Sequence, residues 1–196
     1  FPVIDEEGNV VGRATRKECH SGSKILHAAV HLHVFNSAGD LYLQKRADWK
    51  DIQPGKWDTS VGGHVDFGES VEMALHREAR EELGLTEIGG AERLLNYIWE
   101  SPVEREMIYV HSIVLDEEPK PDQSEVVDGR FWTVGEIEEN IGKDVFTPNF
   151  ELDFIEMLGD ALEPEEIVDK LNELSQLNYN LTENARDYQK IARTVY

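Results

Sequence analysis

The chain has 196 residues, of which 40% are hydrophobic and 30% are charged, and its formal net charge is −21 at pH 7. The length and apolar content predict a globular domain with an appendage and exclude a disordered chain. The negative charge argues against a nucleic-acid-binding protein, and no apolar run approaches the roughly 20 residues of a membrane span. The single cysteine, Cys19, excludes an internal disulfide and is typical of a cytoplasmic protein.

Short apolar runs separated by turn signals predict strands in the first third of the chain. A hairpin is expected at the N-terminus, where Glu-Glu-Gly-Asn joins two such runs, and the turn Asn-Ser-Ala-Gly-Asp separates the next two. The expected strands cover residues 2–5, 10–16, 28–35, 41–45 and the segment that leads into Gly62-Gly63.

A helix, further strands and a second helix are predicted beyond this point. The first helix should stop at Gly84, because glycine readily adopts the left-handed conformation of a helix C-terminus. Strands are expected at residues 94–99, 106–115 and through Phe131-Trp132, followed by a short helix at 134–141.

The composition changes near residue 150. Beyond Pro148, apolar residues recur at helical spacing in a segment rich in Asn, Glu and Gln. We therefore expect residues 1–150 to form one domain and residues 151–196 to form a helical extension that packs on the domain or on a partner. A homodimer is slightly favoured by this helical tail.

Three glutamates in the first predicted helix share one helical face. Glu78, Glu81 and Glu82 are spaced i, i+3 and i+4, so their carboxylates converge. Like charges held together cost stability unless a cation neutralises them, and oxygen ligands favour a hard ion such as Mg²⁺ or Mn²⁺. The spacing indicates a metal site for diphosphate chemistry, because such ions bind through carboxylates and substrate phosphates.

A solvated acidic helix is the alternative interpretation of these glutamates. The helix also carries an apolar stripe, which leaves the acids on a definite adjoining face. This stripe consists of Val71, Leu75, Ala79 and Leu83. Arg77 can pair with Glu81 at i+4 and reach back toward Glu69, which would orient the acids.

The segment at 63–85 resembles the signature box of the Nudix superfamily, and no constrained position is missing. The resemblance implies an α/β/α sandwich with a mixed sheet, here with additional C-terminal helices. It also implies metal-dependent hydrolysis of a nucleoside diphosphate linked to another group. The implied metal ligands are Glu78, Glu81, Glu82 and the carbonyl of Gly63, with Glu69 and Arg77 as supporting residues.

Basic and aromatic residues alternate between positions 44 and 57. Arg46, Lys50, Lys56 and Trp57 are the candidates for substrate binding. A chain with this net charge repels phosphorylated molecules at long range, so a local basic patch would help to attract them. Ordinary surface lysines near a loop are the alternative interpretation.

Residues 10–150 are also similar to the Nudix relatives that isomerise isopentenyl diphosphate. Those enzymes hold a metal with three histidines and two glutamates. His20 and His27 match a histidine pair seven residues apart, and His64 closes a Trp-to-Gly-His segment of the same kind. A Glu-x-Glu follows at Glu104 and Glu106. The resemblance implies a second metal site, which suits Mn²⁺, Zn²⁺ or Mg²⁺, and residual hydrogen-bonded structure is the alternative.

Three departures from the isomerase pattern argue against isomerisation. Gly62 occupies the place of the catalytic cysteine, and a glycine side chain can neither give nor take a proton. Asp144 stands at the place of a late catalytic tryptophan. The first two box glutamates, which that group tends to lose, are both present. His31 and His33 should lie on one strand face as structural residues.

The expected reaction is attack of water on the phosphorus of a small-molecule diphosphate, with Glu81 and Glu82 as catalytic acids of the box. Glu125, in an acidic loop, is the candidate general base, and Glu104 and Glu106 are contenders. The alternatives are an isopentenyl-diphosphate isomerase-like enzyme, an isoprenyl diphosphate hydrolase, and a nucleotide-binding protein without catalysis. The identity of the group linked to the diphosphate stays open.

Overall fold

The computed structural model describes residues 1–50, 53–117, 119–121 and 126–159. The chain divides into two compact units, residues 1–134 and residues 135–196. Most of the extension predicted at 151–196 lies outside the described residues, and the domain boundary near residue 150 stays a prediction. Within the described ranges, no helix is long and apolar enough to cross a membrane.

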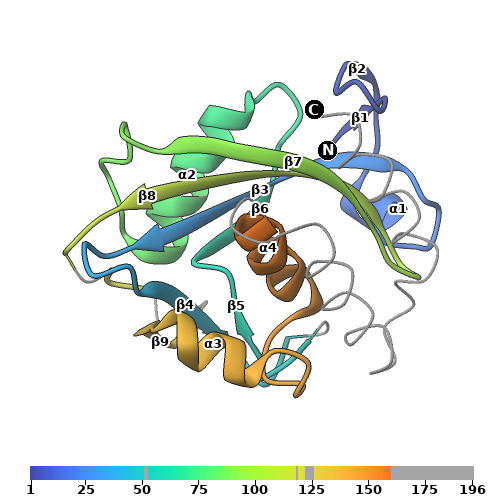
Figure 1. Cartoon of the computed structure of the whole chain (residues 1–196). Helices are drawn as coiled ribbons and strands as arrows, with labels where there is room; N and C mark the ends of the chain where they lie inside the picture. Colours follow the sequence, from blue (N-terminus) through green and yellow to red (C-terminus); the bar gives the residue numbers. More distant parts are fainter. Residues whose placement is uncertain (51–52, 118, 122–125, 160–196) are drawn as a thin grey trace. The chain divides into compact units, whose positions relative to one another are not determined.

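In the part of the chain that the structure describes, the first unit is built on a sheet of nine strands (Figure 1). The strands are β1 (Pro2–Ile4), β2 (Val10–Arg13), β3 (Leu26–Phe35), β4 (Leu41–Arg46), β5 (Trp57–Asp58), β6 (Val61–His64), β7 (Glu92–Glu100), β8 (Arg105–Val114) and β9 (Val126–Trp132). β3 pairs with β1, β4 and β6 antiparallel and with β8 in parallel, so the sheet is mixed, as predicted. β7 pairs with β8, whereas β5 and β9 pair with β4.

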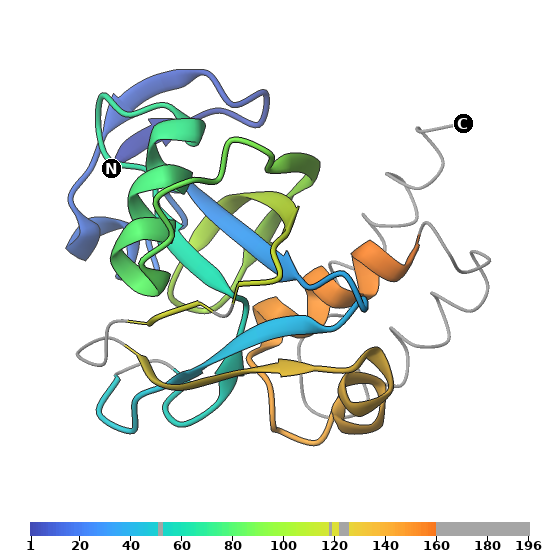
Figure 2. The ribbon, with the colours of Figure 1, turned by 90° about the vertical axis from the view of Figure 1, so that its left-hand side faces the viewer.

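The helix α2 (Val71–Leu83) forms where the box motif predicts it. Ser70 caps its N-terminus by accepting a hydrogen bond from the backbone N–H of Met73, and Gly84 ends it with a φ of 67°. Its buried side chains pack into one core with alternate residues of β3, and Figure 2 shows α2 lying along the sheet. This position confirms the predicted apolar stripe and the predicted stop at Gly84.

The residues of β3 alternate between two faces of the sheet. Val30, Leu32 and Val34 belong to the core that α2 covers. His31 and His33 therefore point to the opposite face, as the alternation in the sequence predicts. Both histidines are buried, at 7% and 0% exposure.

One short helix was not predicted. Residues 10–16 were expected to form a single strand, but β2 ends at Arg13 and the helix α1 (Arg16–Cys19) begins three residues later. Thr15 and Glu18 form a reciprocal capping box, in which each side chain accepts a hydrogen bond from the backbone N–H of the other residue. This Thr-x-x-Glu pattern was the available sequence signal.

The second unit is described as far as residue 159. It contains most of α3 (Val134–Asn140), which confirms the helix predicted at 134–141, and α4 (Pro148–Gly159). The backbone N–H of Gly142 donates to the carboxylate of Glu151 at 2.9 Å, which ties the loop between the two helices to α4.

Candidate metal-binding and catalytic site

The carboxylate of Glu82 lies between α2 and two strands. Its Oε2 atom accepts hydrogen bonds from the Gln44 side chain of β4 (2.9 Å) and from the backbone N–H of Gly62 in β6 (3.1 Å). Burial raises the pKa of Glu82 to about 7 although both hydrogen bonds lower it, and the nearby acids Glu78 and Asp58 raise it further. A cation bound here would offset the cost of the ionised form.

Glu78 packs directly on the backbone of β6. A Cβ atom on Gly63 would overlap the carboxylate of Glu78, so only glycine leaves room for this contact. The Glu78 side chain is 15% exposed, and its Oε1 atom accepts a hydrogen bond from Arg77 Nη1 at 2.7 Å. Burial raises the pKa of Glu78, against the opposing effect of Arg77.

Arg77 joins the box acids to the end of β6. Its guanidinium donates to both oxygens of Glu69 at 2.8 and 3.0 Å and to the backbone carbonyl of His64 at 2.9 Å. It also lies 3.5 Å from Glu81, whose side chain is 52% exposed. The structure thus contains both contacts that the sequence predicted for Arg77.

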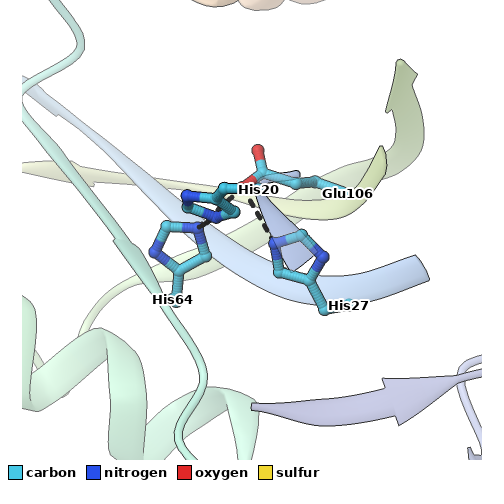
Figure 3. A group of neighbouring side chains, drawn as sticks. All are labelled: His20, His27, His64 and Glu106. Carbon is cyan, nitrogen blue, oxygen red and sulfur yellow. Dashed lines mark hydrogen bonds and ion pairs between the residues drawn. The ribbon is translucent and has the colours of Figure 1, made fainter. Parts of the chain in front are cut away.

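Four side chains form a second cluster near the N-terminal end of β3 (Figure 3). His20 follows α1, His27 lies on β3, His64 on β6 and Glu106 on β8. One potential ligand atom from each residue lies within 4.8 Å of all the others. His64 Nε2 is 2.7 Å from Glu106 Oε1 and 3.2 Å from His20 Nε2, and His27 Nε2 is 3.4 Å from Glu106 Oε1.

The protonation of two residues of this cluster, Glu106 and His20, suits a metal ligand set. Burial alone would raise the pKa of Glu106, but the adjacent His27 and His64 hold it well below its usual range, so the carboxylate is ionised. Burial, His64 and Arg16 lower the pKa of His20 to about 4, which leaves its imidazole neutral. A neutral imidazole and an ionised carboxylate are the forms that bind metal.

The environment of His27 also suits a metal ligand. Its Nδ1 atom lies 2.9 Å from the carbonyl oxygen of Ile25, which fixes the ring orientation. Its Nε2 atom is buried and makes no hydrogen bond among the described residues, although it faces Glu106. A metal-binding histidine characteristically uses one ring nitrogen for the metal and the other for such a backbone contact.

Glu104 lies beside this cluster and outside the group of four. Its carboxylate is 3.7 Å from His20 Nε2. Burial raises the pKa of Glu104 to about 7, and the charge of Glu106 adds to this effect. Glu125, the predicted general base, lies outside the described residues.

The predicted substrate-binding residues fall on β4, β5 and the loop between them. Arg46 forms an ion pair with Asp58 at 2.9 Å, and the charge of Asp58 contributes to the raised pKa of Glu82. Trp57 packs edge-on against Trp132 with ring centroids 5.1 Å apart. For all four residues, Arg46, Lys50, Lys56 and Trp57, a role in binding substrate stays a prediction.

Two residues near the site were missed by sequence reasoning. Gln44 donates to Glu82, yet a lone glutamine in a strand carries no signal of such a role. Arg130 places its guanidinium 3.7 Å from the ring centroid of Trp132 and 5.8 Å from that of Trp57. The order Arg-Phe-Trp was visible, but the pairing of β9 with β4 that creates this stack was not.

Comparisons with known proteins agree with this architecture. The family model of the NUDIX domain matches residues 25–150. An uncharacterized Nudix hydrolase of Nostoc sp. is 35% identical over 133 residues, which cover 66% of this chain and 77% of that protein. An isopentenyl-diphosphate Delta-isomerase of Streptomyces griseus is 33% identical over 153 residues, which cover 76% and 78%. The crystal structure of DR0079 from Deinococcus radiodurans superposes with a TM-score of 0.67 at 26% identity, covering 78% of this chain and 95% of that one.

Proposed function

Because its residues 25–150 match the NUDIX domain, this chain belongs to the Nudix family, and we propose that it is a divalent-metal-dependent hydrolase of diphosphate linkages. The proposal rests on one observation: two glutamates of the box both contact the glycine pair Gly62-Gly63. Glu82 accepts from the N–H of Gly62, and Glu78 packs on Gly63. Carboxylates gathered on one short stretch of backbone repel one another, and a bound cation would neutralise that repulsion.

Glu78, Glu81, Glu82 and the carbonyl of Gly63 would hold Mg²⁺ or Mn²⁺, which would polarise the phosphates and neutralise charge in the transition state. Arg77 keeps Glu78 in place through its 2.7 Å hydrogen bond.

We propose the general base among three acids, Glu125, Glu104 and Glu106. Glu125 remains the candidate from the sequence. Glu104 and Glu106 are the contenders, and both lie at the His/Glu cluster. Burial and the charge of Glu106 raise the pKa of Glu104, which suits a group that accepts a proton near neutral pH. Glu106 is less suited, since its neighbours His27 and His64 hold its carboxylate in the ionised form with a low proton affinity.

A hydrolase of isoprenyl diphosphates is the second candidate. The cluster of His20, His27, His64 and Glu106 favours it, because the resemblance to isopentenyl-diphosphate isomerases implied this ligand set. Isomerisation itself is not proposed, since Gly62 offers no side chain for proton transfer. A nucleotide-binding protein without catalysis is also disfavoured, because all three box glutamates are present.

The test is a hydrolysis screen with Mg²⁺ and Mn²⁺ across nucleoside and isoprenyl diphosphates, with products identified by mass spectrometry. We expect a monophosphate product from at least one class. Turnover of nucleotides would support the first candidate, and turnover of isopentenyl or dimethylallyl diphosphate to the monophosphate would support the second. The proposal fails if no diphosphate is hydrolysed with either ion.

We predict that the His/Glu cluster binds one Mn²⁺ or Zn²⁺ ion and that Glu106→Gln removes it. The substitution deletes the charge that faces the three imidazoles, so the ion would lose its only anionic ligand in the cluster. Metal content after dialysis should fall by about one ion per chain. Glu100→Gln is the control, because this glutamate of β7 pairs with Lys24 and Arg105 at the surface. An unchanged metal content in Glu106→Gln would contradict the assignment of Glu106 as a ligand of such an ion.

A further inference from the structure

The two oxygens of the Glu82 carboxylate have different surroundings. Oε2 accepts two hydrogen bonds, from the side-chain amide of Gln44 at 2.9 Å and from the backbone N–H of Gly62 at 3.1 Å. Oε1 accepts none from the described residues, and it is not among the fully buried side-chain atoms that lack a partner. Oε1 is therefore the oxygen of this carboxylate that stays accessible to an ion.

Glu82 differs from the two acids around it in how its charge is balanced. Glu78 has an arginine partner, Arg77 at 2.7 Å, and Asp58 has another, Arg46 at 2.9 Å. Among the described residues Glu82 makes no ion pair, and its two donors are a neutral amide and a neutral backbone N–H. The charge of the ionised Glu82 is thus left for a cation to balance.

Gln44 is held in place by its strand and by burial. It lies on β4, where its register partners are Asp58 of β5 and Gly129 of β9, so it is enclosed by a strand on each side. The residue is only 8% exposed. Because its amide donates to Oε2, the Glu82 carboxylate cannot turn about its last bond without losing that hydrogen bond. This contact fixes which oxygen faces the ion.

We propose that Gln44 is a positioning residue of the metal site, which together with the N–H of Gly62 holds Oε2 of Glu82 so that Oε1 alone binds the divalent ion of the box. The inference rests on the proposed function and deepens it, because it names a residue outside the box that decides how one box glutamate binds its ion. Hydrogen-bond partners of a ligating side chain commonly contribute roughly 10- to 100-fold to metal affinity.

The first test compares the Mg²⁺ affinity of Gln44→Leu with that of the wild type by calorimetry. Leucine is close to glutamine in volume but has no donor, so Oε2 would keep only the N–H of Gly62. We expect Mg²⁺ to bind roughly 10- to 100-fold more weakly. Mg²⁺ is the probe because the three imidazoles of the His/Glu cluster suit transition metals better than Mg²⁺.

Ser60→Ala is the matched control for a general loss of stability. Ser60 is fully buried, donates to the carbonyl of Tyr42 on β4 and accepts from the N–H of Val34 on β3 at 2.9 Å. Its substitution disturbs the same strands without removing either hydrogen bond to Glu82. It should lower the melting temperature and leave the Mg²⁺ affinity unchanged.

A crystal structure of the wild type with Mn²⁺ is the second test, and it does not depend on how the variants fold. We expect the ion on Oε1 of Glu82, with Gln44 still donating to Oε2. An ion on Oε2, wild-type Mg²⁺ affinity in Gln44→Leu, or an equal loss of affinity in Ser60→Ala would overturn the inference and leave the hydrolase proposal standing. A wild-type protein that neither binds Mg²⁺ nor hydrolyses any diphosphate would overturn both.

Discussion

Glu82→Gln is expected to reduce Mg²⁺-dependent diphosphate hydrolysis by roughly 1,000-fold, because a bound cation contributes several kcal/mol to the stabilisation of such a transition state. The amide keeps the size of the side chain, and its oxygen can still accept from Gln44 and Gly62. The substitution therefore removes the charge while preserving the packing. Steady-state kinetics on the substrate found in the screen gives the measurement.

The same substitution should change how the stability of the metal-free protein depends on pH. The pKa of Glu82 is raised to about 7 from an ordinary value of 4.5, so the native state prefers the protonated acid. Its contribution to stability is fully present below pH 4.5 and is lost as the pH rises through 7. In EDTA at pH 8, Glu82→Gln should be the more stable protein, and this advantage should vanish near pH 4.5.

Thermal unfolding with and without Mg²⁺ separates this effect from a general loss of structure. Mg²⁺ should raise the melting temperature of the wild type and leave that of Glu82→Gln unchanged, because ligand binding stabilises only the state that binds. Glu72→Gln is the control, since this glutamate lies exposed in the first turn of the same helix. Full activity in Glu82→Gln would remove this carboxylate from the catalytic site.

The helix of the box was predictable because its information is local. The apolar stripe follows from 3.6 residues per turn and the stop follows from Gly84, and the structure places both as expected. The contacts of Arg77 with Glu69 and Glu81 follow from the same geometry. Local periodicity therefore predicted the part of the candidate site that lies on the single helix α2.

The parts of the site that depend on strand pairing could not be predicted from spacing alone. Gln44 reaches Glu82 because β4 leaves β3 after two paired residues, Val34↔Tyr42 and Phe35↔Leu41, and no local pattern encodes where that divergence occurs. His31 faces Gly62 because of a single register between β3 and β6. A shift of one residue in either pairing would turn the side chains of the shifted strand to the other face of the sheet.

The adjacent glycines of β6 also look equivalent in sequence and differ in the structure. They point to opposite faces, as successive strand residues do. Gly63 faces α2, where Glu78 fills the space that a side chain would need, whereas Gly62 faces His31. The box motif covers residues 63–85, so it includes the glycine that faces α2 but not the one that faces β3.

Gly63→Ala is the second substitution expected to have a large effect. Its methyl group would overlap the carboxylate of Glu78, so either this side chain leaves its place beside Arg77 or β6 shifts. We expect activity to fall at least roughly 100-fold, and overpacking of this kind typically costs about 1–3 kcal/mol of stability. The measurements are steady-state kinetics and chemical unfolding, with Gly89→Ala as control, since a Cβ there meets no atom within 4 Å.

A double-mutant cycle with Glu78→Ala tests the cause of that effect. If the overlap with Glu78 is the reason, Gly63→Ala should cost far less stability when residue 78 is alanine, because the space is then open. Activity should not recover, since the proposed metal ligand is gone. An equal stability loss in both backgrounds would instead place the strain in the backbone of β6. Full activity in Gly63→Ala alone would contradict the position assigned to Glu78, because the carboxylate cannot share that space with a methyl group.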